Sequence, residues 1–319
     1  MQPAYSVIFL TTATGAGYGM LALLGVLRAT GNLPDDRAFG LFALGLALAL
    51  ISAGLLASMA HLGRPERAWR ALSQWRSSWL SREGVLAIIG YGPAVVFAFG
   101  WLVLQKNEGL WPLAGLATAV LSIATVYATS MIYRSLAAIP RWDQPLVAPV
   151  YMILALATGA IWLNAVLVPF VAGHALIQAI CFATLALAWV LKIGYWRAID
   201  STVGTSTTAS ATGLEGLGPV PPQVRPLDPP HVQDNYLLKE MGFTIARKHA
   251  HKLRRLTHLL AFIVPLVLIV IQAATSGPVS VLAAALAAIS VSFGVVLERW
   301  LFFAEAQHKV MLYYGADRV

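Results

Sequence analysis

The fold is decided where a polar segment, HLGRPERAWRALSQWRSSWLSRE at residues 61–83, separates two apolar segments at residues 41–60 and 84–104. Each apolar segment has about the ~20 residues that an α-helix needs to cross the hydrocarbon core of a bilayer. The polar segment is too rich in charge to be a span, and its arginines and tryptophans are typical of a membrane surface. The sequence therefore predicts two antiparallel membrane helices joined at one surface by a 61–83 connection, which includes a short interfacial helix.

The composition extends this prediction to the whole chain. Of the 319 residues, 58% are hydrophobic and only 11% are charged, unlike a soluble domain. The helical period and length of the apolar runs exclude an outer-membrane barrel, whose strands take about ten alternating residues. We predict an all-α integral membrane protein with eight transmembrane helices, near residues 5–27, 38–60, 84–104, 112–133, 147–169, 174–196, 256–275 and 278–297.

We expect these helices to form two four-helix bundles. Residues 1–133 would hold helices 1–4 with the 61–83 connection. Residues 134–319 would hold helices 5–8 with a long connection at residues 197–255. Lys192 is counted with that connection, and the residues from Glu298 onward are expected to form an amphipathic extension of helix 8.

Small and polar residues inside the spans are expected to serve packing. Gly15 and Gly19 lie four residues apart on helix 1 and give a small-residue surface that another helix can approach closely. Trp162 and Asn164 in helix 5 are expected to satisfy a neighbouring helix rather than to line a polar cavity.

The lysines and arginines are divided unequally between the two membrane surfaces. With eight spans, all but three of the 22, namely Arg28, Arg37 and Lys106, lie on the side that holds both termini. By the positive-inside rule that side is cytoplasmic, which predicts a multi-pass protein of the bacterial inner membrane with both termini in the cytoplasm. The net charge of +8 then lies on the cytoplasmic face, where it suits anionic lipid or an acidic partner.

The 61–83 connection holds the residue types that a quinone site requires. A quinone needs a hydrogen-bond donor to its carbonyl oxygen, groups that exchange protons, and a flat apolar surface for its ring. His61 and Glu83 flank the connection, with Ser81 expected to cap the next helix. Histidine also favours helix C-termini, glutamate helix N-termini and arginine the cytoplasmic surface. The combination at one membrane surface nevertheless favours a quinone site.

The end of the 197–255 connection is strongly basic. Its candidate partner-docking residues are Arg247, Lys248, Lys252, Arg254 and Arg255. A positive anchor for the following helix explains them, and so does a docking surface for a soluble subunit. Both explanations can hold together.

Several other classes of site are disfavoured. A membrane haem needs two histidines at matched depth on facing helices, and His61 with His258 is the one pair that could serve. The spacing of the histidines does not match a zinc or di-metal site. We therefore expect no haem or metal in this chain. The single cysteine, Cys181, cannot hold an iron–sulfur cluster. A secondary transporter would show interrupted helices with polar groups at mid-membrane, whereas the predicted spans have no charge at their centres. A purely structural scaffold would need no pairing of a histidine with a glutamate.

Two sequence segments resemble a known family. HLGRPERAWRAL followed by SSWLSREG, within residues 61–84, resembles the membrane anchor subunits of dimethyl sulfoxide reductase-type molybdoenzymes. The ATGLEGLG loop, with NYLLKEMGF and ARKHAHKLR, is similar to anchors of the quinone-linked sulfite dehydrogenases. The resemblance implies an eight-helix subunit without the catalytic centre. Such an anchor binds ubiquinone or menaquinone and exchanges electrons with an iron–sulfur subunit, which is linked to a molybdopterin catalytic subunit.

The resemblance also implies residue roles and a reaction. Family residues tied to quinone function match His61, Arg67 and Glu83, and Arg64 and Trp79 complete the candidate quinone-binding set. We expect the complex to oxidise sulfite to sulfate. A dimethyl sulfoxide reductase anchor that uses menaquinol is the alternative, and a secondary transporter is the second alternative.

The predicted topology can be tested with reporter fusions. We expect a fusion after Thr30 to report the periplasm and a fusion after Val319 to report the cytoplasm, because the basic residues lie on the side of the termini. Alkaline phosphatase and green fluorescent protein fusions measure the two locations. A cytoplasmic signal at Thr30 or a periplasmic one at Val319 would contradict the topology.

Overall fold

The computed structural model describes residues 4–59, 64–171, 174–201, 206–214, 224, 245–314, 316 and 318–319, with only the backbone at residues 245–248. The described residues are predominantly helical, and eight helical segments are long and apolar enough to cross a membrane. The prediction of an all-α protein with eight spans is confirmed.

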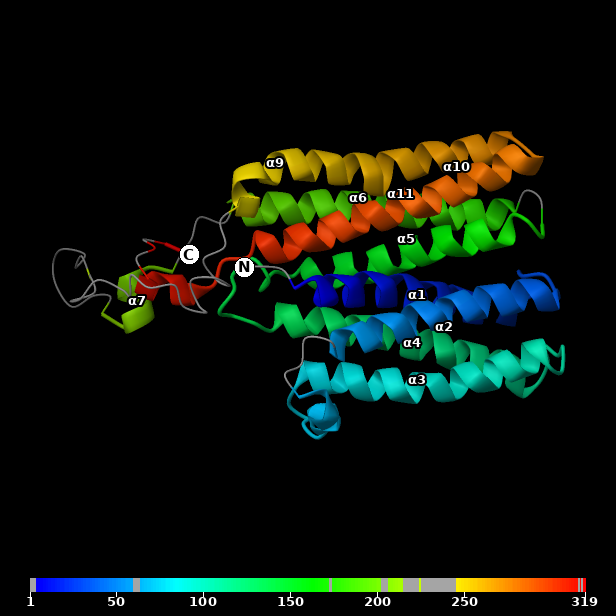
Figure 1. Ribbon diagram of the computed structural model, residues 1–319, viewed down its shortest axis with the longest axis horizontal. Coiled ribbons are helices and arrows are strands. Elements are labelled where there is room, and N and C mark those ends of the chain that lie inside the picture. The colour runs from blue at the N-terminus through cyan, green and yellow to red at the C-terminus, as the bar shows by residue number, and fades with distance from the viewer. Residues whose placement is uncertain are drawn as a thin grey trace.

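The spans run alongside one another as a bundle (Figure 1). They are α1 (Tyr5–Ala29), α2 (Arg37–Met59), α3 (Trp79–Leu102), α4 (Leu110–Arg134), α5 (Val147–Leu167), α6 (Ala175–Ser201), the continuous α9 (Ile245–Thr257), η2 (His258–Ile263) and α10 (Val264–Ala274), and α11 (Gly277–Ala304). In the part of the chain that the structure describes, three short helices lie outside them, namely η1 (Pro65–Leu72), α7 (Thr208–Thr212) and η3 (Lys309–Tyr314). We call the end of the bundle that carries these short helices and both marked chain ends the terminal side (Figure 1).

Helices α1 and α5 are the most deeply buried spans, and their backbones cross in direct contact. A Cβ atom on Gly19 would lie 1.8 Å from the carbonyl oxygen of Ala155, and one on Gly159 would lie 2.2 Å from the amide nitrogen of Met20. Van der Waals contact between small residues is a main source of helix association in lipid, where there is no hydrophobic drive between helices. The packing role expected for Gly19 is confirmed.

Helix α1 also packs on α2 and α4, and α5 packs on α6, α4 and α11. These contacts make α1 and α5 the centre around which the other spans gather (Figure 1). The grouping into two four-helix bundles, with a boundary at residues 133 and 134, stays a prediction.

Two spans extend further on the terminal side than the sequence predicted. Helix α11 continues to Ala304, and α6 continues to Ser201. Lys192 of α6 forms an ion pair with Glu298 of α11, and the two side chains are 1% and 0% exposed. The assignment of both residues to surface segments was therefore wrong. Buried charges need a partner, and the ion pair between α6 and α11 provides it for both residues.

Polar residues within the spans join helices. The side-chain amides of Asn164 and Gln272 exchange hydrogen bonds of 2.6 and 3.1 Å, and Trp162 donates to the hydroxyl of Ser292 at 3.1 Å. The structural role expected for Trp162 and Asn164 is confirmed.

The crossing of α1 and α5 gives a stability prediction. Gly19→Ala should lower the free energy of unfolding by about 1–3 kcal/mol, because its methyl group meets backbone that cannot move aside. Gly15→Ala is the matched control on the same helix, since its Cβ would lie 3.9 Å from Ala155 Cβ, an ordinary contact. Thermal unfolding of both variants in detergent measures the difference. Equal stability would contradict the close crossing.

Candidate functional site

Helix α3 begins earlier than predicted. Its N-cap is Ser78, whose hydroxyl accepts a hydrogen bond from the amide of Ser81 at 3.5 Å, so the assignment of Ser81 as the cap was wrong. The hydroxyl of Ser81 instead donates to the carbonyl of Ala71 on η1. Because the helix begins at Trp79, Trp79 and Glu83 lie four residues apart on one helix face.

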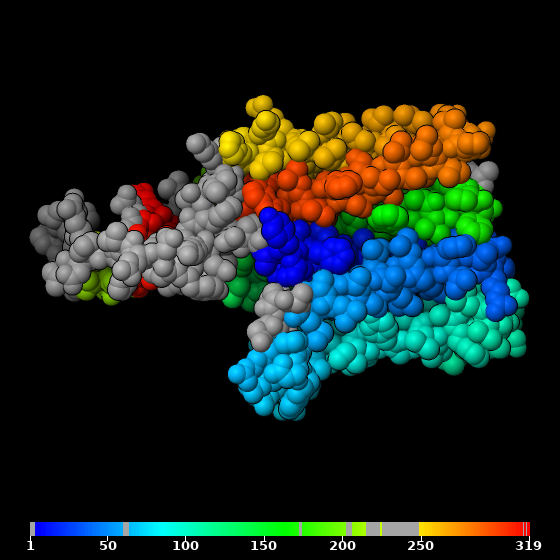
Figure 2. Space-filling view, in the orientation of Figure 1, coloured from blue at the N-terminus to red at the C-terminus, as the bar shows by residue number. Residues whose placement is uncertain are grey.

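The described part of the 61–83 connection is tied to the start of α3. The predicted short helix is present as η1. Arg82 donates from Nε to the carbonyl of Trp75 at 3.0 Å and from Nη2 to the carbonyl of Arg76 at 2.7 Å, while its guanidinium lies over the Trp79 ring. The connection projects at the edge of the terminal side, where it is drawn in light blue (Figure 2). A single arginine therefore fixes the turn that precedes α3.

Glu83 is buried where α3 packs on α4. It is 6% exposed, and its Oε1 accepts a hydrogen bond of 2.6 Å from the hydroxyl of Thr129. Among the described residues Glu83 has no ion-pair partner. A buried carboxyl group with one hydroxyl partner and no cation is suited to take up and release a proton.

The other predicted quinone residues lie further out. The Trp79 ring is half-buried and contacts the Tyr127 ring edge-on at 5.8 Å. Arg64 is exposed, and so is Arg67, whose Nε lies 3.8 Å from Glu66. His61 lies outside the described residues. The structure thus joins Trp79 with Glu83 on α3, and it does not bring Arg64 or Arg67 to the buried carboxyl group.

The predicted docking residues include both exposed and buried side chains. Lys252 and Arg255 are exposed on α9, while the side chains of Arg247 and Lys248 lie outside the described residues. Arg254 differs from the expectation of a surface residue. It is 9% exposed and forms ion pairs with Asp200 at 2.5 Å and Glu305 at 2.9 Å. These pairs fasten α9 to α6 and to the end of α11.

An apolar crevice between α1, α2, α3 and α4 begins one helical turn from Glu83. It has about 220 Å³ of space including its open mouth, and Ala87, Gly90, Tyr91 and Ala94 of α3 form one wall. Tyr18 of α1 forms part of the opposite wall, and its buried hydroxyl has no hydrogen-bond partner among the described residues. Ala87 lies on the same helix face as Glu83. The crevice therefore offers apolar surface and the buried hydroxyl of Tyr18, and Glu83 lies one helical turn beyond its lining on α3.

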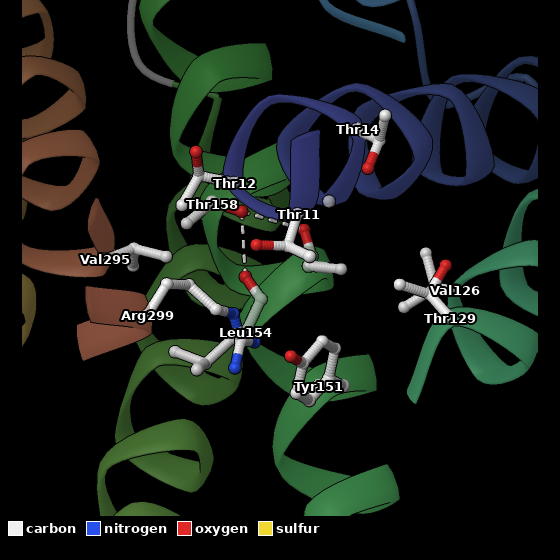
Figure 3. Close-up of a pocket in the computed structure, with 12 residues that line it drawn as sticks. Thr11, Thr12, Thr14, Val126, Thr129, Tyr151, Leu154, Thr158, Val295 and Arg299 are labelled. Atoms are coloured by element: carbon white, nitrogen blue, oxygen red, sulfur yellow. Dashed lines mark hydrogen bonds between the residues drawn. The ribbon is translucent and has the colours of Figure 1, made fainter. Parts of the chain in front are cut away.

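A second opening, which we call the polar cleft, lies between α1, α4, α5 and α11 (Figure 3). It has about 330 Å³ of space including its mouth, and Thr129, the hydrogen-bond partner of Glu83, is part of its lining. Its other polar residues are Thr11, Thr12, Thr14, Tyr151, Thr158 and Arg299. The sequence interpretation missed all of them and also Tyr18, because a threonine or tyrosine in an apolar span carries no signal of the face on which it lies.

The fold and the site define a multi-pass membrane protein with a buried carboxyl group near one end of the bundle. In the described part of the chain, no three His, Cys, Asp or Glu side chains gather as a metal site. The model of the family described as DMSO reductase anchor subunit (DmsC) matches residues 1–315. The chain belongs to this family, as its resemblance predicted.

Individual relatives agree with this assignment. The chain is 31% identical to the C subunit of sulfite dehydrogenase from Allochromatium vinosum, over 98% of this chain and 99% of that protein. It is 29% identical to the C polypeptide of the anaerobic dimethyl sulfoxide reductase from Haemophilus influenzae, over 38% of this chain and 43% of that protein. For the protein of the same description from Escherichia coli, the identity is 34% over 29% of this chain and 32% of that protein.

The role of Arg82 can be tested by amide hydrogen exchange. Arg82→Gln removes two hydrogen bonds from a charged donor, each worth about 1.5 kcal/mol, so exchange in residues 73–78 should become about ten-fold faster or more. Arg70→Gln is the control, because Arg70 lies over the Trp69 ring and its side chain holds no backbone carbonyl among the described residues. Mass spectrometry of the exchanged protein provides the measurement. An unchanged rate in Arg82→Gln would show that the turn is held by other contacts.

Proposed function

We propose that this chain is the quinone-reactive membrane anchor of a molybdopterin oxidoreductase complex, and that it exchanges electrons with an iron–sulfur subunit. The observation that carries the proposal is Glu83, a buried carboxyl group without an ion pair among the described residues, one helical turn from Ala87 in the wall of the apolar crevice. Membership of the DMSO reductase anchor family supports it.

The residues of the crevice fit a quinone. Its apolar walls match a flat ring, and the unpartnered hydroxyl of Tyr18 can donate to a carbonyl oxygen. A quinone supplies a lipid-soluble carrier of two electrons and two protons. Glu83 would hold or release a proton at the edge of the ring, with Thr129 keeping its carboxyl group in place. Trp79 lies one turn away on α3, at the terminal end of the helix.

The partner subunit would dock on the terminal side, close to Glu83. Electron transfer requires its terminal cluster to approach the quinone, and the exposed Lys252 and Arg255 offer a basic surface there. Arg64 and Arg67 are exposed on the same side, and we propose them, with His61, as further residues of the quinone site. By the charge division this side is cytoplasmic, in a bacterial inner membrane.

Sulfite oxidation to sulfate is the reaction we propose for the complex. It is supported by the similarity to the C subunit of sulfite dehydrogenase over nearly the full length of both proteins. The matches to the dimethyl sulfoxide reductase proteins cover less than half of either sequence, so the corresponding menaquinol-dependent reduction is the second candidate.

Glu83→Gln tests the quinone site. The change keeps the size of the side chain and removes the proton-exchanging group, so quinone-coupled turnover should fall by at least about 100-fold. The complex should still assemble and reduce artificial acceptors. Glu108→Gln, an exposed carboxylate on the opposite side, is the control and should behave as the wild type. Intact quinone turnover in Glu83→Gln would place the site elsewhere.

Membranes that contain the wild-type complex can be assayed to decide between the two reactions. Sulfite should drive reduction of an oxidised quinone. If the membranes oxidise quinol with dimethyl sulfoxide and show no sulfite-driven quinone reduction, the second candidate is correct.

A further inference from the structure

The walls of the polar cleft carry both acceptors and donors. The hydroxyls of Thr11 and Thr12 donate to carbonyls of their own helix at 3.0 and 2.8 Å. The hydroxyl of Thr158 donates to the carbonyl of Leu154 at 2.8 Å (Figure 3). These bonds leave the oxygen lone pairs of all three threonines as acceptors. The buried Nε of Arg299 and hydroxyl of Tyr151 have no hydrogen-bond partner among the described residues. Buried polar groups are nearly always satisfied by protein or by water, and such water typically makes about three hydrogen bonds. The cleft is therefore suited to water.

One end of the cleft reaches Glu83 through Thr129. The Thr129 hydroxyl lies 2.6 Å from Glu83 Oε1 and 3.0 Å from the carbonyl oxygen of Thr125, so its one proton has two acceptors. When Glu83 is ionised, Thr129 donates to it. When Glu83 is protonated, its carboxyl group can donate to the Thr129 oxygen while Thr129 donates to Thr125. Thr129 thus keeps its hydrogen bonds in both states of the carboxyl group.

The other end of the cleft leads toward the terminal side. Tyr151 and Arg299 also line a second, smaller opening together with Lys192 and Tyr195. Glu298 lies between the cations there, as the ion-pair partner of Lys192 and 3.3 Å from Arg299 Nη1. The Tyr195 hydroxyl donates at 2.9 Å to the carbonyl of Arg141, in the connection between α4 and α5. This second opening has no room for water, so beyond the cleft the polar groups toward the terminal surface are the side chains of Arg299, Glu298, Lys192 and Tyr195.

We propose that the polar cleft holds hydrogen-bonded water that carries protons between Glu83 and the terminal side, with Thr129 as the relay and Arg299 as a positioning residue for the water. The inference rests on the proposed function of Glu83. Reduction of one quinone to quinol takes up two electrons from the iron–sulfur partner and two protons, and these protons pass through the cleft. Quinol oxidation releases the same two protons in the reverse direction.

Thr158→Val in the purified complex is the central test. It keeps the shape of the side chain and removes a hydroxyl from the middle of the cleft, away from Glu83. We expect kcat for quinone to fall by about ten-fold or more and the solvent deuterium isotope effect to rise, with an unchanged KM for quinone and unchanged turnover with artificial acceptors. Thr129→Val should lower kcat and raise the isotope effect in the same way. Thr158→Ser, which keeps the hydroxyl, should have the kcat of the wild type.

Thr118→Val is the matched control. Thr118 is buried in α4, and its hydroxyl also donates to a carbonyl of its own helix, but it does not line the cleft. It should retain the kcat and isotope effect of the wild type. A loss equal to that of Thr158→Val would overturn the proposal.

The outcomes separate this proposal from the function on which it rests. If Glu83→Gln abolishes quinone turnover while both valine variants keep the wild-type rate and isotope effect, the water path is wrong and the quinone site stands. If Thr158→Val raises KM without changing kcat, the cleft holds the quinone itself and the path is again wrong. If the valine variants do not fold, a high-resolution density map of the wild-type complex shows whether the cleft holds water. Water between Thr158 and Arg299 supports the path, and a dry cleft overturns it.

Discussion

The rest of the bundle depends on the backbone contact between α1 and α5 at Gly19 and Gly159. Only residues without side chains allow this approach, and in lipid such contact is a main source of helix association. Beside this crossing, threonines of both helices line an opening, the polar cleft. Because α4 also packs on α1, its Thr129 reaches this opening while it holds Glu83 of α3. The packing at the centre of the bundle thus determines the surroundings of the carboxyl group at its edge.

Buried charged residues within the spans are either ion-paired or, like Glu83, hydrogen-bonded to an uncharged partner. Lys192 and Glu298 neutralise each other, and Arg254 is held by two carboxylates. Such pairs offset the cost of removing charge from water, and breaking one leaves an uncompensated buried charge. Glu83 has a hydroxyl partner and no cation among the described residues. The paired charges are suited to hold helices together, whereas Glu83 is free to change its protonation state.

The two openings beside Glu83 differ in chemistry. The crevice on one side is lined mainly by apolar residues of four helices, and the cleft on the other side by threonines, a tyrosine and an arginine. They share α1 and α4 but no lining residue. In the function we propose, this separation gives the quinone and the protons different approaches to one carboxyl group. Apolar walls favour the ring, and hydrogen-bonding walls favour water.

The sequence by itself determined the class of fold and the eight spans, and it singled out Glu83 as a candidate site residue. Apolar length and charge at a membrane surface are local properties that a protein displays before it folds. Only the tertiary structure decided that Lys192 and Glu298 lie inside the bundle, that Arg254 turns inward, and that Arg64 and Arg67 stay exposed. It also found Thr129, Tyr18 and Arg299, because the partner of a buried side chain is set by contacts between helices distant in sequence. A threonine in an apolar span has the same sequence pattern whether it faces lipid or a buried carboxyl group.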